Sequence, residues 1–82
     1  MSTVLTDAKA MENLSSNLRR LLADRSMSQA ELARITGDGE MNISRYVRGV
    51  VMPGAGALAR LAEALSVPTD RLLSGKISQK AG

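Results

Sequence analysis

The stretch MSQAELARITGDGEMNISRYVRG, residues 27–49, contains start and stop signals for two short helices. Ser28 and Glu31 form a capping box, in which each side chain can accept a hydrogen bond from the backbone N–H of the other residue, so a helix of about eight residues begins at Gln29. Gly37 suits the left-handed conformation that ends a helix. Isolated helices of this length are unstable in water, so the segment must pack against other parts of the chain.

After the turn at residues 37–39, a second short helix is predicted from Glu40 to Arg48, ended by Gly49. Its apolar side chains share one side at helical spacing: Ile43, Tyr46 and Val47. The polar residues of the opposite side are Asn42, Arg45 and Arg48. Acids near the start of this helix complement the positive end of its dipole, and the arginines face away from any core.

Apolar residues at helical spacing predict three more helices and no strand. The first runs from about residue 11 to 25, marked by Met11, Leu14, Leu18, Leu21 and Leu22. The loop VVMPGAGA precedes a helix in ALARLAEALSV, and PTDRLLSG contains a last short helix with Thr69 as its cap and Gly75 as its stop.

The expected fold is therefore all-α and compact, with five helices. We expect residues 1–10 to form a flexible N-terminal arm and residues 11–75 to form the helical domain. Residues 76–82 are expected to be a flexible tail or the start of a linker, because they are polar and follow the last stop signal.

Composition excludes several classes of site. The chain has 82 residues, which is enough for one small domain. It contains no Cys and no His, so Ser-His-Asp or Cys-His catalysis and zinc sites built on these residues are excluded. We expect no enzymatic activity, no cofactor and no metal. Tyr46 is the only aromatic residue, which makes stacking on single-stranded bases a poor prospect.

The net charge of +3 is a mild bias toward an anionic partner, although a solvated surface of mixed charge explains it equally well. No apolar run approaches the ~20 residues needed to span a bilayer. The N-terminus lacks the basic start and apolar core of a secretory signal. The sequence therefore predicts a soluble protein of the cytoplasm.

A capped helix, a glycine-led turn and a second short helix together form a helix-turn-helix. In such a unit the first helix crosses the DNA backbone and the second enters the major groove. A generic bundle of short helices explains the same pattern without DNA, so the pattern alone leaves both interpretations open.

Several motifs occur together over residues 14–75: MSQAELARITG, then NISRYVRG, a proline, and LARLAEALSVPTDRLL. In this combination the chain resembles the lambda-repressor-like helix-turn-helix family, which includes phage repressors, related transcription regulators and some antitoxins. The resemblance implies a five-helix domain that binds double-stranded DNA, commonly as a homodimer on an operator with two half-sites.

The resemblance also implies roles for individual residues. Gln29 matches a glutamine that opens the first helix of the unit and binds a phosphate, at a helix N-terminus that favours anions. The start of the next helix matches base-reading positions, Arg45 matches another one turn further on, and Arg48 matches a position that contacts the DNA backbone. The predicted DNA-binding residues are Gln29, Glu40, Met41, Asn42, Ser44, Arg45 and Arg48.

Several of these residues have a purely structural alternative. Glu40 can serve only as an acid stabilised by the helix dipole, although a glutamate can also accept a hydrogen bond from cytosine N4. Met41 can simply cover the turn. Arg48 can be solvated or paired within the chain.

Two positions depart from the family pattern. Many relatives pair an arginine and an acid where this chain has Leu22 and Val47. Because packed apolar residues often replace such a pair without loss of stability, we expect Leu22 to touch Val47. The turn glycine is usually followed by an apolar residue, whereas Asp38 and Gly39 follow it here. This change leaves open a later start or a greater mobility of the second helix.

Three functions fit these observations. The leading one is a transcriptional repressor of phage or prophage type, with Val50, Val51, Met52, Leu73 and Ile77 as candidate contacts of its homodimer. An antitoxin that represses its own operon and binds a toxin shares the fold. The apolar loop 50–52, where relatives often carry basic residues, favours a protein-interaction module instead. The tail SGKISQKAG suits the start of a linker to a further C-terminal domain or a protein partner.

Overall fold

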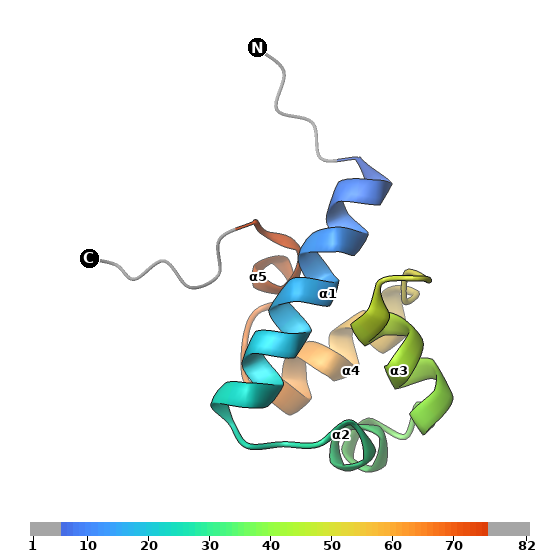
Figure 1. Ribbon diagram of the computed structural model, residues 1–82, viewed down its shortest axis with the longest axis vertical. Helices are drawn as coiled ribbons and strands as arrows, with labels where there is room; N and C mark the ends of the chain where they lie inside the picture. The colour runs from blue at the N-terminus through green and yellow to red at the C-terminus, as the bar shows by residue number, and fades with distance from the viewer. Residues whose placement is uncertain (1–5, 76–82) are drawn as a thin grey trace, which may run out of the picture.

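The computed structural model describes residues 6–75, which form five helices and no strand (Figure 1). The helices are α1 (Asp7–Asp24), α2 (Gln29–Thr36), α3 (Glu40–Arg48), α4 (Ala55–Leu65) and α5 (Thr69–Leu73). The predicted all-α, five-helix fold is therefore confirmed. Within the described range, no helix is both long enough and apolar enough to cross a membrane.

The first helix begins earlier than predicted, at Asp7 rather than near residue 11. The Thr6 hydroxyl accepts a hydrogen bond from the Lys9 N–H at 3.1 Å, and Asp7 lies in the first turn. These are helix start signals that the apolar spacing does not register. Residues 7–10 thus belong to α1 and not to a flexible arm, and Ala10 is buried. The rest of the predicted arm, residues 1–5, and the predicted tail, residues 76–82, lie outside the described residues.

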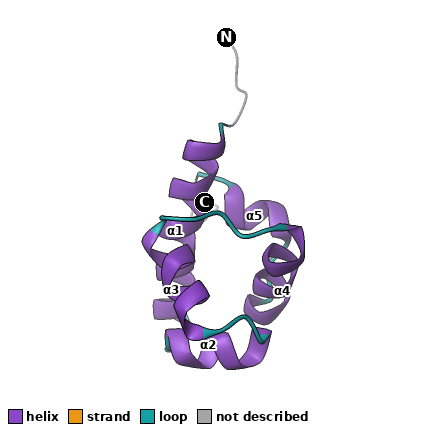
Figure 2. Cartoon of the chain, turned by 90° about the vertical axis from the view of Figure 1, so that its right-hand side faces the viewer, coloured by secondary structure: helices purple, strands orange, loops and turns teal. Residues whose placement is uncertain are grey.

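The core lies where side chains from all five helices meet. α1 packs on α3 and α5, and α2 packs on α3 and α4 (Figure 2). Leu22 and Val47, the residues expected to touch, are both in this core, on the two helices α1 and α3 that pack together. The side chains buried completely are Leu14, Leu18, Leu32, Ile43, Leu61, Leu65 and Leu72. Since α3 is held against α1 and α2, its opposite side is left facing solvent.

Two asparagines of α1 hold the last helix in place. Asn17 donates from Nδ2 to the carbonyl oxygens of Leu72 at 2.8 Å and Ser74 at 2.9 Å. Asn13 donates from Nδ2 to the carbonyl oxygen of Leu73 at 2.9 Å. The last carbonyl groups of a helix have no partner within it, so these amides satisfy the end of α5. They explain how a helix of five residues is stabilised and why both asparagines are buried.

The limits of α5 differ from the prediction. Pro68, not Thr69, is the N-cap residue, and the helix ends before Ser74 rather than at Gly75. Pro68 has the extended conformation of an N-cap, with φ −68° and ψ 152°, so Thr69 becomes the first helical residue.

Candidate nucleic-acid interface

The start of α2 is built as predicted. Ser28 Oγ accepts a hydrogen bond from the Glu31 N–H at 3.0 Å, and Glu31 Oε1 accepts one from the Ser28 N–H at 2.8 Å. Gly37 ends the helix with a φ of 78°. Gln29 is the first helical residue and is exposed. It therefore lies at the end of α2 where free N–H groups and the helix dipole favour an anion.

The turn between α2 and α3 is held by Asp38. Its carboxylate accepts two hydrogen bonds from the Arg60 guanidinium of α4, from Nη2 at 2.6 Å and from Nε at 3.2 Å. The hydrogen bonds from Arg60 hold the pKa of the Asp38 carboxyl below its usual value. Gly39 has a φ of 87°, and α3 begins at Glu40, so the later start that the sequence left open is not observed. The unusual acid in the turn connects it to α4.

The third helix has a buried inner side and a polar outer side. Ile43 is fully buried, and Tyr46 and Val47 are nearly so, which confirms the predicted inner side. On the outer side, Glu40, Met41, Asn42, Arg45 and Arg48 are exposed, and Ser44 is half-buried. All the predicted DNA-binding residues except Gln29 thus lie on one short helix, and Gln29 begins the helix packed against it.

Hydrogen bonds within the described part of the chain restrain some of these outer side chains and leave others free of such contacts. Arg48 Nε donates to Ser44 Oγ at 3.2 Å, so the internal pairing considered for Arg48 is present. Asn42 Nδ2 donates to the Asp38 carbonyl oxygen at 3.0 Å, which leaves its other N–H and its side-chain oxygen for a partner. The Arg45 side chain has no hydrogen bond or ion pair to any residue between 6 and 75. Arg45 and Glu40 are therefore the polar side chains on this side of α3 that no hydrogen bond or ion pair to a described residue restrains.

A buried hydrogen bond fixes the C-terminal end of α3 to α1. Ser15 Oγ donates to the Val47 carbonyl oxygen at 2.6 Å, and Arg19 Nη2 donates to Ser15 Oγ at 3.1 Å. Gly49 follows α3 with a φ of 74°, and a Cβ atom there would lie 3.1 Å from Ser15 Cβ, so the crossing favours glycine. Ser15 was not predicted, because nothing in the local sequence separates it from the exposed Ser16 that follows it.

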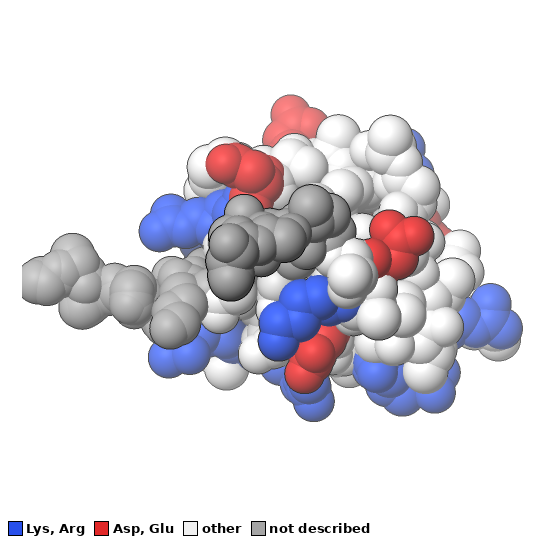
Figure 3. Space-filling model, turned by 90° about the horizontal axis from the view of Figure 1, so that it is seen from above, with Lys and Arg blue, Asp and Glu red and all other residues white. Residues whose placement is uncertain are grey.

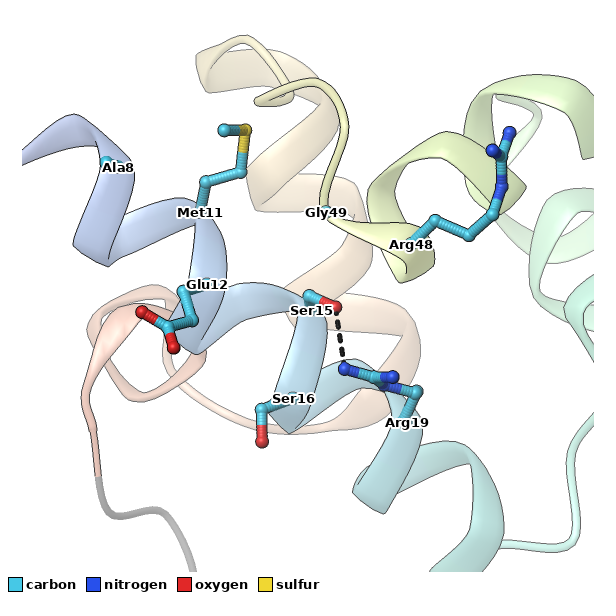
Figure 4. A pocket seen from close by; sticks show the side chains of 8 residues that line it. All are labelled: Ala8, Met11, Glu12, Ser15, Ser16, Arg19, Arg48 and Gly49. Carbon is cyan, nitrogen blue, oxygen red and sulfur yellow. Dashed lines mark hydrogen bonds between the residues drawn. The ribbon is translucent and has the colours of Figure 1, made fainter.

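A pocket of about 400 Å³ lies along this crossing of α1 and α3 (Figure 4). Figure 4 shows the Arg19 guanidinium beside Ser15 and the Arg48 side chain pointing away from α1. Glu12 lines the same pocket. Because an acid and two arginines share its lining, the pocket offers no single sign of charge.

Charge is distributed differently over different faces of the molecule. The face at the N-terminal end of α1 carries acidic and basic side chains next to one another (Figure 3). On α3, in contrast, Arg45 and Arg48 are exposed and Glu40 is the helix's one acid. The outer side of α3 is thus a better surface for a polyanion than the mixed face above α1.

Comparison with protein families agrees with this geometry. The family described as Cro/C1-type HTH DNA-binding domain matches residues 17–74, which is most of the chain. The chain belongs to this family, and it is a helix-turn-helix domain whose partner is DNA. The resemblance to lambda-repressor-like proteins is thereby confirmed. Comparisons with curated proteins and with solved structures gave no significant match.

Proposed function

We propose that this Cro/C1-type domain acts as a transcriptional repressor of phage or prophage type, which reads an operator in the major groove with α3. The outer side of α3 is the observation that supports the proposal. Arg45 is exposed there without a partner in residues 6–75. Both ends of the helix are held by bonds to the rest of the domain, so its side chains meet DNA in a fixed arrangement.

The first two turns of α3 supply the base contacts in this proposal. Arg45 bonds O6 and N7 of a guanine through two N–H groups. Glu40 accepts from cytosine N4, and Met41, which is 66% exposed, contacts a thymine methyl group. Asn42 retains an oxygen and an N–H, the pair of groups that bonds an adenine.

The remaining residues hold the DNA backbone. Gln29 binds a phosphate at the start of α2, where the helix dipole adds to the attraction. Arg48 and Ser44, already bonded to each other, face a second phosphate near the end of α3. Such contacts carry no sequence information. The contact of the charged Arg48 also makes binding fall more steeply with salt, by about 0.9 in the logarithmic slope, because neutralising a phosphate releases counterions.

A homodimer completes the proposal, because a single helix of nine residues reads few base pairs. Val50, Val51 and Met52 form an apolar loop, 58%, 40% and 36% exposed, that a second copy can cover. Leu73 packs against the core instead, which makes it a weaker candidate, and Ile77 lies outside the described residues. A two-fold dimer places its reading helices in half-sites roughly 34–36 Å apart.

Selection of bound sites from a random pool of duplex DNA tests the proposal. We expect inverted half-sites about one helical turn apart, and sedimentation on the selected site should find two chains. Val51→Asp should weaken this assembly, because it places a charge in the apolar loop. Ala59→Asp, at an exposed position of α4, is the matched control. One chain bound to an asymmetric site would contradict the homodimer.

The antitoxin alternative is supported by the same apolar loop, which a toxin can cover as well as a second copy can. Sedimentation of the protein alone and on its selected DNA separates the two. Self-association that Val51→Asp weakens supports the repressor dimer. A chain that stays monomeric in both states, with its apolar loop uncovered, supports a heterologous protein partner.

A further inference from the structure

The turn that leads into α3 is tied to α4 by an ion pair with two parallel hydrogen bonds. Arg60 Nη2 lies 2.6 Å from Asp38 Oδ1, and Arg60 Nε lies 3.2 Å from Asp38 Oδ2. This two-point arrangement fixes orientation as well as distance. The Asp38 side chain is 10% exposed and the Arg60 side chain 50% exposed, so the carboxylate is sheltered beside a partly solvated guanidinium.

The backbone of Asp38 also forms hydrogen bonds with the helices on both sides of the turn. Its N–H donates to Thr36 Oγ at 3.3 Å, at the end of α2. Its carbonyl oxygen accepts from Asn42 Nδ2 at 3.0 Å, in the first turn of α3. One residue therefore connects α2, α3 and α4, and its carbonyl group orients the amide of a proposed base-reading side chain.

The glycines of the turn add little packing of their own. Gly37 and Gly39 have φ values of 78° and 87°, and no atom outside their chain neighbours lies within 4 Å of the place where a Cβ would be. Gly39 is the N-cap of α3 and provides no side-chain hydrogen bond to it. Within the turn, the hydrogen bonds of Asp38 are thus the side-chain restraint on where α3 begins, in addition to the burial of Ile43 in the first turn of the helix.

We propose that Arg60, acting through Asp38, is a positioning residue for sequence recognition. By holding the turn against α4, it sets the start of α3 so that Asn42 meets its base edge in the right orientation. The inference rests on the proposed function, in which Asn42 reads a base. Arg60 belongs to α4, outside the helix-turn-helix unit, and it touches no base itself.

Three variants separate this role from a simple effect of charge: Asp38→Asn, Arg60→Gln, and the double variant that carries both. Each single variant changes the net charge by one, whereas the double variant keeps the net charge of +3 and loses the pair. Arg71→Gln on α5 is the control for loss of one positive charge, because this arginine is exposed and its side chain has no bond to other described residues.

The measured quantity is the affinity for the selected operator divided by the affinity for an operator that is changed at the base pair that Asn42 reads. That base pair is identified as the one whose preference Asn42→Ala removes. A well-placed two-bond contact discriminates by about 5- to 150-fold. We expect the ratio to fall at least about threefold in all three pair variants and to stay at the wild-type value in Arg71→Gln. Arg60→Lys should have an intermediate ratio, because lysine retains the charge and one hydrogen bond.

Active protein is titrated first, because loss of folding lowers the active fraction without changing the ratio between two DNAs. A reduced ratio in the double variant, at full active fraction, supports the inference. If the double variant keeps the wild-type ratio, the inference is overturned while the proposed function stands. If Asn42→Ala removes no base preference of the wild-type chain, Asn42 reads no base, and both that part of the proposed function and the inference are wrong.

Discussion

The two ends of α3 are held by different kinds of interaction. At its C-terminal end, Ser15 bonds the Val47 carbonyl oxygen inside the core, and Gly49 packs closely on Ser15. At its N-terminal end, the cap residue makes no side-chain bond, and the turn depends on a pair between Asp38 and a half-exposed Arg60. A buried carbonyl group without a partner costs about 1–3 kcal/mol, whereas pairs near the surface contribute little to stability.

The difference indicates that the two ends serve different purposes. Substitutions at the C-terminal end should lower the free energy of unfolding, because they disturb the packing of α3 on α1. Changes at the N-terminal turn should leave the fold largely intact and alter how α3 meets DNA. A protein can adjust its base preference at one end of the helix without losing the anchor at the other.

The largest expected effect on stability is that of Gly49→Ala. The new Cβ would sit 3.1 Å from Ser15 Cβ in a residue with a φ of 74°, so we expect a loss of about 2–5 kcal/mol from backbone strain and crowding together. Gly37→Ala is the control at the turn, where φ is 78° and no atom lies within 4 Å of the added carbon. Gly37→Ala should lower the free energy of unfolding, measured by urea denaturation, by only about 1–2 kcal/mol. Equal losses would show that the packing at Gly49 is unimportant.

A smaller loss is expected for Ser15→Ala. It removes the hydroxyl that bonds the buried Val47 carbonyl oxygen, so the free energy of unfolding should fall by about 1–3 kcal/mol. Ser16→Ala, at the exposed neighbouring position, should change it by less than about 0.5 kcal/mol. If both variants unfold at the same denaturant concentration, the hydrogen bond to Val47 does not anchor α3.

The smallest expected effect is a dependence of stability on pH at the turn. Because Arg60 lowers the pKa of Asp38 below its ordinary value of 3.8, the pair stabilises the fold at pH values above 3.8, and this contribution is lost as the pH falls through the lower pKa of the folded state. The difference in melting temperature between the wild type and Asp38→Asn should therefore shrink as the pH is lowered from 6 toward 2. A difference that stays constant over this range would contradict the pairing.

Elements whose signals lie close together in the sequence were predictable. The capping box of Ser28 and Glu31 and the stop at Gly37 define α2 within ten residues of chain, and the spacing of Ile43 and Val47 separates the two sides of α3. The start of α1 was missed because apolar spacing marks where a helix is buried, not where it begins. Its first turn precedes the stripe of large apolar residues, and the cap at Thr6 and the acid Asp7 mark it.

The bonds that hold α3 were not predictable, since they join residues distant in the sequence. Asp38 and Arg60 are 22 residues apart, and Ser15 and Val47 are 32 apart. Which side chains meet across such distances depends on how the helices cross, and no local pattern encodes it. For the same reason the sequence left the effect of Asp38 on the turn open, whereas in the structure its carboxylate connects the turn to α4.

The most direct test of base reading by the outer side of α3 compares Arg45→Ala with Arg48→Ala on the selected operator, on its single-base variants and at several salt concentrations. The two variants remove the same charge from one helix. Arg45→Ala should weaken binding to the operator and relax the preference at one base pair of each half-site by about 1–3 kcal/mol. Arg48→Ala should weaken all sequences about equally and lower the salt slope by about one unit for each phosphate that the variant no longer binds. If Arg45→Ala instead weakens every sequence by the same factor, Arg45 binds a phosphate, and the assignment of the reading residues is wrong.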